Sequence, residues 1–128
     1  MVKVIMLIKK RPDLTMEEFI DYYDNHHVPL MHRLLTKGAA VHRRNFVIPN
    51  VADVGAADNL DATAPDYDVI CEVFYEDRET AESVMKDFQD PRIRRQCEED
   101  EANFLLRGSV KRYIVDAHET LFRPLKGA

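Results

Sequence analysis

The spacing of the hydrophobic residues leaves this chain few possible folds. It alternates between a period of two, typical of strands, and a period near 3.6, typical of helices. The order is strand, helix, strand, strand, helix, strand, over residues 2–10, 15–35, 40–48, 67–75, 77–105 and 110–119. This order predicts an α+β, ferredoxin-like βαββαβ fold, with a four-stranded antiparallel sheet and the helices on one face.

The first and third predicted strands are apolar on both faces. In residues 2–10, for example, Met6 and Leu7 point to opposite sides and both are hydrophobic. Helices cover only one face of such a sheet, so the second apolar face needs another cover. A second copy of the chain is the simplest one. We therefore expect a homodimer whose two sheets close into a dimeric α/β barrel.

Length and composition indicate an ordinary globular protein. The 128 residues suit one domain over residues 1–128, with 45% hydrophobic and 32% charged residues. The net charge of -5 argues against nucleic acid or an anionic membrane as a partner, because phosphate binding needs a basic surface. The apolar run Val4–Ile8 is too short for a membrane span or a signal sequence.

Cysteine and glycine usage argues against the common cofactors. The two cysteines, Cys71 and Cys97, lack the spacing of a metal site or a redox motif. The chain has 4 glycines and no glycine-rich phosphate loop, so a nucleotide cofactor is not expected. We therefore expect a cytoplasmic protein with no metal and no cofactor.

Residues 15–35 predict an amphipathic helix with an ionisable group in its apolar stripe. Thr15 and Glu18 have the spacing of a capping box. The stripe consists of Phe19, Tyr23, His27, Leu30 and Leu34. Pro29 has no amide proton, so the helix should kink or end near His27. An inward imidazole beside a loosened turn suggests a site; the alternative is a structural core histidine.

The helix predicted over residues 91–105 carries an acidic group on its apolar face. Asp100 shares a stripe with Cys97 and Phe104, and Glu101 lies next to it. An inward carboxylate needs a partner to stay ionised, which makes Asp100 and Glu101 candidate partners of His27. The alternative is that this acidic run is solvated surface.

Two adjacent arginines lie in the strand predicted over residues 40–48. Arg43 and Arg44 point to opposite faces, and whichever points inward needs an anionic or carbonyl partner. The alternative is that both lie at a solvated edge of the sheet. Residues 49–66, which follow, show no periodicity and form a candidate lid.

Several blocks of the chain resemble the EthD-like family of the dimeric α/β barrel superfamily. They are VKVIMLIKKRPDLTMEEFIDYY, HVPLM with His27 and Pro29, HRRNFVIP, and DEANFL with Asp100, Glu101 and Phe104. Tyr23 stands where the family often has tryptophan. The resemblance implies a ferredoxin-like homodimer with a hydrophobic cavity between sheet and helices. Similar proteins act as cofactor-free decarboxylases or dehydratases on aromatic polyketides; distant relatives include lactone isomerases, polyketide cyclases and haem-degrading monooxygenases.

The first functional hypothesis is a cofactor-independent lyase or isomerase that acts on a small cyclic or aromatic compound by decarboxylation, dehydration or a proton shift. His27 would shuttle the proton, and Asp100 or Glu101 would fix its tautomer. Arg44 or Arg43 would hold a carboxylate or an enolate. The predicted substrate-binding residues are Tyr23, Arg43, Asn45, Tyr67, Tyr113 and Phe104.

Two other functions fit the same residues. One is a non-catalytic protein that binds a small ligand or assists a partner enzyme, with His27 and Asp100 as a structural pair. The other is a haem-dependent monooxygenase with His27 as the axial ligand.

Overall fold

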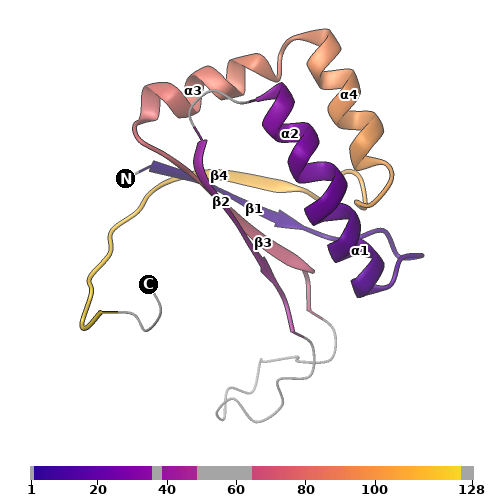
Figure 1. Ribbon diagram of the computed structural model, residues 1–128, viewed down its shortest axis with the longest axis horizontal. Helices are drawn as coiled ribbons and strands as arrows, with labels where there is room; N and C mark the ends of the chain where they lie inside the picture. The colour runs from indigo at the N-terminus through magenta and orange to yellow at the C-terminus, as the bar shows by residue number, and fades with distance from the viewer. Residues whose placement is uncertain (1, 36–38, 49–64, 125–128) are drawn as a thin grey trace.

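The computed structural model describes residues 2–35, 39–48 and 65–124, and in these ranges it confirms the predicted order of elements. The strands are β1 (Val2–Ile8), β2 (Ala39–Phe46), β3 (Val69–Tyr75) and β4 (Lys111–Asp116). They form one antiparallel sheet in the order β2-β3-β1-β4. The helical segments are α1 (Met16–Tyr22), η1 (Tyr23–His27), α2 (Val28–Leu34), α3 (Arg78–Asp87) and α4 (Pro91–Glu101). All lie on one side of the sheet (Figure 1), which gives the predicted ferredoxin-like fold.

A π-helical turn replaces the kink predicted in the first helical region. The Thr15 hydroxyl accepts a hydrogen bond from the backbone amide of Glu18 at 3.1 Å. The Glu18 carboxylate accepts one from the backbone amide of Thr15 at 3.0 Å, so α1 begins with a capping box. In η1 the Val28 amide donates to the Tyr23 carbonyl five residues earlier. Pro29 cannot donate to a regular α-helical turn, and the wider turn keeps the chain helical instead of ending it.

The π turn moves the inward face of α2 by one residue. The predicted stripe placed Leu30 and Leu34 inward, but Val28, Met31 and Leu35 line the space between α2 and the sheet. The extra residue in the π turn causes this shift, because it breaks the 3.6-residue period after Tyr23.

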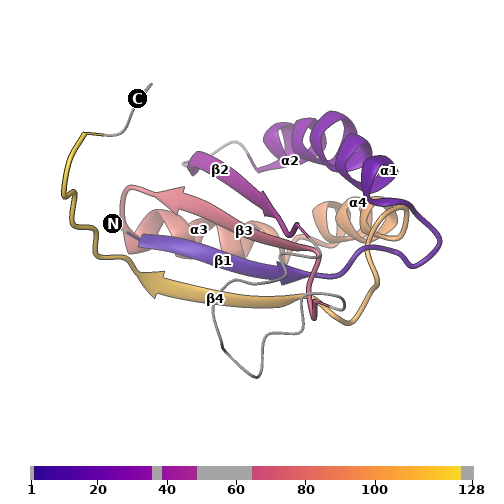
Figure 2. The same cartoon turned by 90° about the horizontal axis from the view of Figure 1, so that it is seen from below.

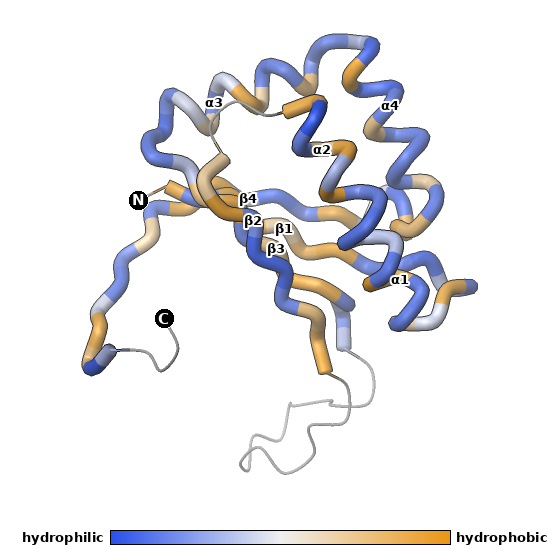
Figure 3. The backbone as a smooth tube through the Cα atoms, viewed as in Figure 1, coloured by the Kyte–Doolittle hydropathy of each residue, from blue (hydrophilic) through white to orange (hydrophobic). Residues whose placement is uncertain are grey.

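The core lies between the helices and the helix-facing side of the sheet. One cluster packs Phe19 and Tyr23 of the first helical region against Phe104 and against Val69 and Cys71 of β3. A second cluster packs α3 on β1 and β3 through Val4, Tyr75, Ala81 and Val84. Figure 3 shows that hydrophobic residues predominate along β1, whereas α4 is mostly hydrophilic. The core therefore depends on the sheet and on one face of each helix.

The described helices leave the opposite face of the sheet without a cover. Viewed from below, β1 and β3 lie in front of α3 (Figure 2). Ile70 and Tyr113 lie on this face and are 39% and 52% exposed. The segment after β4 runs away from the sheet (Figure 1), and its Phe122 side chain is 95% exposed. Apolar surface of this kind marks an interaction surface more often than it faces water.

Candidate active site

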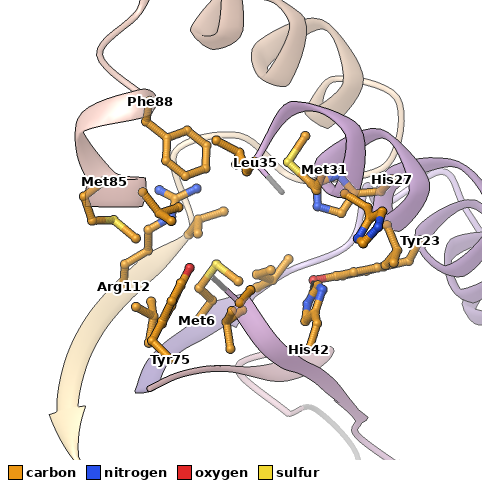
Figure 4. A pocket seen from close by; sticks show the side chains of 18 of the residues that line it. Met6, Tyr23, His27, Met31, Leu35, His42, Tyr75, Met85, Phe88 and Arg112 are labelled. Carbon is orange, nitrogen blue, oxygen red and sulfur yellow. Dashed lines mark hydrogen bonds between the residues drawn. The ribbon is translucent and has the colours of Figure 1, made fainter. Parts of the chain in front are cut away.

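A cavity of about 270 Å³ lies between the sheet and the helices. Figure 4 shows His27 and His42 on one side of this space and Phe88 and Arg112 on the other. Much of the remaining lining is apolar and includes Val4, Met6, Ile8, Met31, Leu35 and Val73. An apolar pocket with a few convergent polar groups is typical of a small-molecule site.

His27 and Asp100 meet at this cavity. His27 ends η1 and Asp100 lies in the last turn of α4, and Nδ1 of His27 is 2.5 Å from Oδ2 of Asp100. Both residues are buried. The Tyr22 hydroxyl donates to Oδ1 of Asp100 at 2.8 Å and accepts a hydrogen bond from Nδ2 of Asn103 at 2.9 Å. Both carboxylate oxygens are therefore held in place.

This network keeps Asp100 ionised and sets the tautomer of His27. Burial alone would raise the pKa of Asp100, but the hydrogen bonds from His27 and Tyr22 outweigh it and lower that pKa below its ordinary value. A carboxylate beside Nδ1 keeps a proton on that nitrogen, so the lone pair of a neutral His27 is on Nε2. Because His27 lines the cavity, Nε2 is the nitrogen available to a ligand.

Two aromatic rings hold the imidazole of His27 in position. The centroid of the Phe104 ring is 4.8 Å from that of His27, and the Tyr23 ring meets it edge-on at 5.0 Å. Tyr23 and Phe104 are both fully buried. Tyr23 lines the cavity as predicted for a substrate-binding residue, whereas Phe104 packs behind His27.

A second imidazole, that of His42, faces the cavity from β2. Its Nε2 is 3.4 Å from the Tyr23 hydroxyl, which in turn is 2.9 Å from Sγ of Cys71. Burial raises the pKa of Tyr23 well above its usual value and raises that of Cys71 to about 11. Burial, with the nearby charge of Arg44, lowers the pKa of His42 to about 4. All three groups of this cluster are therefore uncharged near pH 7.

Glu101 lines the cavity but pairs with Arg112 rather than with His27. Oε1 of Glu101 is 3.5 Å from the guanidinium of Arg112, which enters from β4 opposite Met6. Burial raises the pKa of Glu101, and the charge of Arg112 offsets part of this increase. Neither His42 nor Arg112 was predicted from the sequence as a site residue. Strand alternation was the sequence signal that could have identified them, because it places both residues on the face of the sheet that the helices cover.

Arg44 lies beside the cavity without lining it. Its Nε donates to Oδ1 of Asp24 at 2.7 Å, and its guanidinium is 5.8 Å from the centroid of the Tyr23 ring. Arg44 thus has the anionic partner expected for an inward-facing arginine. That partner is a carboxylate of the chain itself, so the structure does not present this guanidinium to a ligand.

Three predicted substrate-binding residues lie on the opposite face of the sheet. Arg43 pairs across the strands with Glu72, and Nδ2 of Asn45 is 3.2 Å from the same carboxylate. Tyr113, on β4, lies opposite Ile5 of β1, and its side chain is half exposed. Successive strand residues alternate between faces, so the sheet separates these side chains from the cavity.

The last two predictions about the site concern the segment before β3. Tyr67 is not among the residues that line the cavity; the ammonium of Lys9 lies 5.9 Å from its ring centroid. Most of the candidate lid, residues 49–64, lies outside the described residues. Within the described ranges, no group of three or more His, Cys, Asp or Glu residues is placed to hold a metal ion.

We expect the protein to lose stability as the pH falls from about 6.5 to about 4. An unfolded histidine has a pKa near 6.5, whereas folding holds the pKa of His42 at about 4. Between these values the unfolded chain binds a proton that the folded protein does not. The free energy of unfolding is therefore highest above pH 6.5 and falls with acid, by about 2 kcal/mol. Urea unfolding across this range measures the loss.

His42→Gln is the matching variant for this measurement, because it keeps a polar side chain but does not titrate. We expect its stability to vary less between pH 6.5 and pH 4 than that of the original protein. Asp100 affects stability in a lower pH range. Folding lowers its pKa, so its contribution to the free energy of unfolding is lost only as the pH falls below 3.8, the ordinary pKa of an aspartate. An unchanged slope in His42→Gln would assign the pH dependence to other groups.

Comparison with known proteins gives one family and one fold. Residues 11–108 match the EthD domain. An ethyl tert-butyl ether D (EthD) family protein from Bacillus halodurans is 21% identical with a TM-score of 0.58, over 92% of this chain and 99% of that one. An EthD-like protein from Ralstonia eutropha is 15% identical with a TM-score of 0.59, over 95% and 94%. HapK from Hahella chejuensis is 13% identical with a TM-score of 0.55, over 100% of both chains. A search of curated proteins found no match.

Proposed function

This chain belongs to the EthD family, and on that premise we propose that its cavity is the active site of a cofactor-independent lyase or isomerase. The substrate would be a small cyclic or aromatic compound that loses and regains a proton in the reaction. The observation that supports this proposal most is the His27–Asp100 pair beside an apolar cavity. An imidazole oriented by a buried carboxylate is suited to accept a proton and to return it.

In the proposed reaction, Nε2 of His27 takes a proton from a carbon next to a carbonyl group. The C–H bonding electrons move onto the substrate and its oxygen gains negative charge, while Asp100 stabilises the imidazolium that forms. The imidazolium then gives the proton to another carbon in an isomerisation, or to a departing hydroxyl group in a dehydration. A decarboxylation would need no C–H cleavage: the bond to the carboxylate breaks, its electrons stay on the ring carbon as carbon dioxide leaves, and His27, protonated from solvent, gives its proton to that carbon.

The uncharged cluster of Tyr23, His42 and Cys71 contains the groups that we propose stabilise the negative charge on the substrate oxygen. The Tyr23 hydroxyl and the ring of His42 both belong to residues that line the cavity. Their shifted pKa values keep both groups neutral near pH 7, so either can donate a hydrogen bond to a substrate oxygen as its charge grows. A base on one element and neutral donors beside it are sufficient for a proton shift without a cofactor.

Hydrogen exchange at carbon tests this proposal without knowledge of the final product. The protein would be incubated in deuterium oxide with cyclic diketones, aromatic keto acids and unsaturated lactones, and deuterium uptake would be measured by mass spectrometry. Uptake above the protein-free rate is expected for at least one compound class. The absence of protein-dependent exchange across the panel, or a Soret band in the purified protein, would contradict a cofactor-free proton-transfer enzyme.

The uncovered sheet face supports a homodimer, in which two such faces pack together. We expect Ile70→Lys to weaken or abolish this dimer, because a buried unpaired charge costs several kcal/mol. Leu106→Lys is a matched control: Leu106 is also 39% exposed but follows α4, outside the sheet. Sedimentation at micromolar concentration measures the result. A monomeric original protein, or a dimer that survives Ile70→Lys, would contradict this interface.

The proposed location of this enzyme is the cytoplasm. Cys71 and Cys97 are both free thiols, which fits a reducing compartment. Among the described helices, none has the length and hydropathy needed to cross a bilayer.

A further inference from the structure

Arg112 stands at the end of the cavity away from the two imidazoles. It lies on β4 opposite Met6, on the side of the sheet that faces the helices. Figure 4 shows its side chain near Met85 and Phe88, with His27, Tyr23 and His42 across the open space. The Arg112 side chain is 45% exposed, so it forms part of the cavity wall while its guanidinium stays accessible to an anion that enters from solvent.

A second cavity, of about 540 Å³, is also lined by Arg112. Six residues line both cavities: Met85, Phe88, Glu101, Leu105, Val110 and Arg112. Two of these six are charged, and they form the ion pair described above. The two spaces therefore adjoin, and a ligand too long for the first cavity would meet the guanidinium at their junction.

The ion pair at this junction is long for a charge-assisted hydrogen bond. Its atoms are 3.5 Å apart, whereas charge-assisted hydrogen bonds are about 2.7–2.9 Å long. For comparison, Arg44 and Asp24 are 2.7 Å apart. Burial also raises the pKa of Glu101, although the charge of Arg112 offsets part of this increase. Because the contact with Glu101 is long, the guanidinium of Arg112 retains the capacity to bind another carboxylate.

The second cavity adds positive charge rather than removing it. Arg94 and Arg107 also line it, and both pair with the single carboxylate of Glu98, at 3.5 and 4.0 Å. With Arg112 and Glu101, the lining of this cavity holds three guanidinium groups and two carboxylates. The local field therefore favours an anion at the junction.

We infer that the ligand of this cavity is a cyclic or aromatic acid, whose ring lies in the apolar space beside His27 and whose carboxylate is held by Arg112. This inference rests on the proposed function, because it places the reacting ring beside the same base. It also assigns to Arg112 the anion-binding role expected of Arg43 or Arg44. Arg44 is paired with Asp24 at 2.7 Å, and Arg43 lies on the face of the sheet away from the cavity.

Two dyes with a common ring system test the inference. Anilinonaphthalene sulfonate carries one anionic group, and phenylnaphthylamine has the same rings without it. Fluorescence titration should show that the protein binds the sulfonate at least about tenfold more tightly, a difference of about 1.4 kcal/mol. Arg112→Met should remove this preference and leave the affinity for the neutral dye unchanged. Arg112→Lys, which keeps the charge, should retain most of it.

Arg78→Met is the matched control, because Arg78 is an exposed arginine on α3 that pairs with Glu82 outside both cavities. It should keep the full preference for the anionic dye. Equal affinity of the original protein for the two dyes would overturn the inference, as would an equal loss in Arg112→Met and Arg78→Met. His27→Gln separates the two proposals: it should abolish proton exchange but preserve the preference for the anionic dye.

Discussion

Replacing His27 with glutamine is expected to lower the rate of protein-dependent hydrogen exchange by about a hundredfold or more. Glutamine is polar and similar in size, so it can keep a hydrogen bond to Asp100, but it cannot take up and release a proton near neutral pH. The loss should appear in the turnover rate rather than in ligand affinity, since the base acts in the transition state. Deuterium uptake at saturating ligand measures this effect.

His26→Gln is a close control for this variant. His26 is the preceding residue, but its side chain is exposed and stacks on Tyr22, with ring centroids 5.0 Å apart. It is not among the residues that line the cavity, so its replacement should leave exchange within about twofold of the original rate. Equal effects at the two positions would show that the loss follows from disturbance of the helix and not from loss of a base.

A second variant separates catalysis from structure. Asp100→Asn keeps the shape of the carboxylate but removes its charge, and should also slow exchange because the imidazolium loses its stabilising partner. If His27→Gln folds and exchanges at the original rate, another group is the base and the contact of His27 with Asp100 is structural. A double-mutant cycle on unfolding would then show strong coupling between His27 and Asp100.

The sequence predicted the order of elements because each element has a clear period and a clear start. Thr15 with Glu18 is such a start signal, and it forms the capping box of α1. In the structure Asp77 and Asp90 cap α3 and α4 in a similar way. The meeting of His27 and Asp100 could be anticipated for a related reason. Both are ionisable groups on apolar stripes, and such groups need partners in the core.

Other features depend on geometry that local patterns do not encode. Pro29 signalled an irregular turn, but the choice between a kink and a π turn depends on packing around Tyr23 and His27. In β2, alternation separates Arg43 from Arg44 without stating which face the helices cover. The ion-pair partners show which face each arginine occupies. Arg43 pairs with Glu72 on the neighbouring strand, and Arg44 pairs with Asp24 in η1. The position of Arg112 in the lining of two cavities depends on how β4 packs against the helices, which no local pattern encodes.

Replacing Phe104 with alanine should cause the largest loss of stability of any change considered. The ring is fully buried and packs against Phe19, Tyr22, Tyr23 and His27, with centroid distances of 4.8 to 5.8 Å. Truncation of a core phenylalanine leaves a cavity and costs about 3–5 kcal/mol. Phe104→Leu fills more of the space and should cost less. Urea unfolding at a fixed protein concentration measures both, because dimerisation makes apparent stability depend on concentration.

Phe122→Ala is the control, because Phe122 is 95% exposed, and it should change stability by less than about 0.5 kcal/mol. A similarly small loss in Phe104→Ala would mean that the four rings around it are not a rigid core. The same variant also affects the proposed chemistry. The Phe104 ring packs against the imidazole of His27, so its loss gives that ring freedom to leave the orientation set by Asp100. Folded Phe104→Ala protein should therefore exchange protons more slowly than Phe104→Leu, although both retain His27 and Asp100.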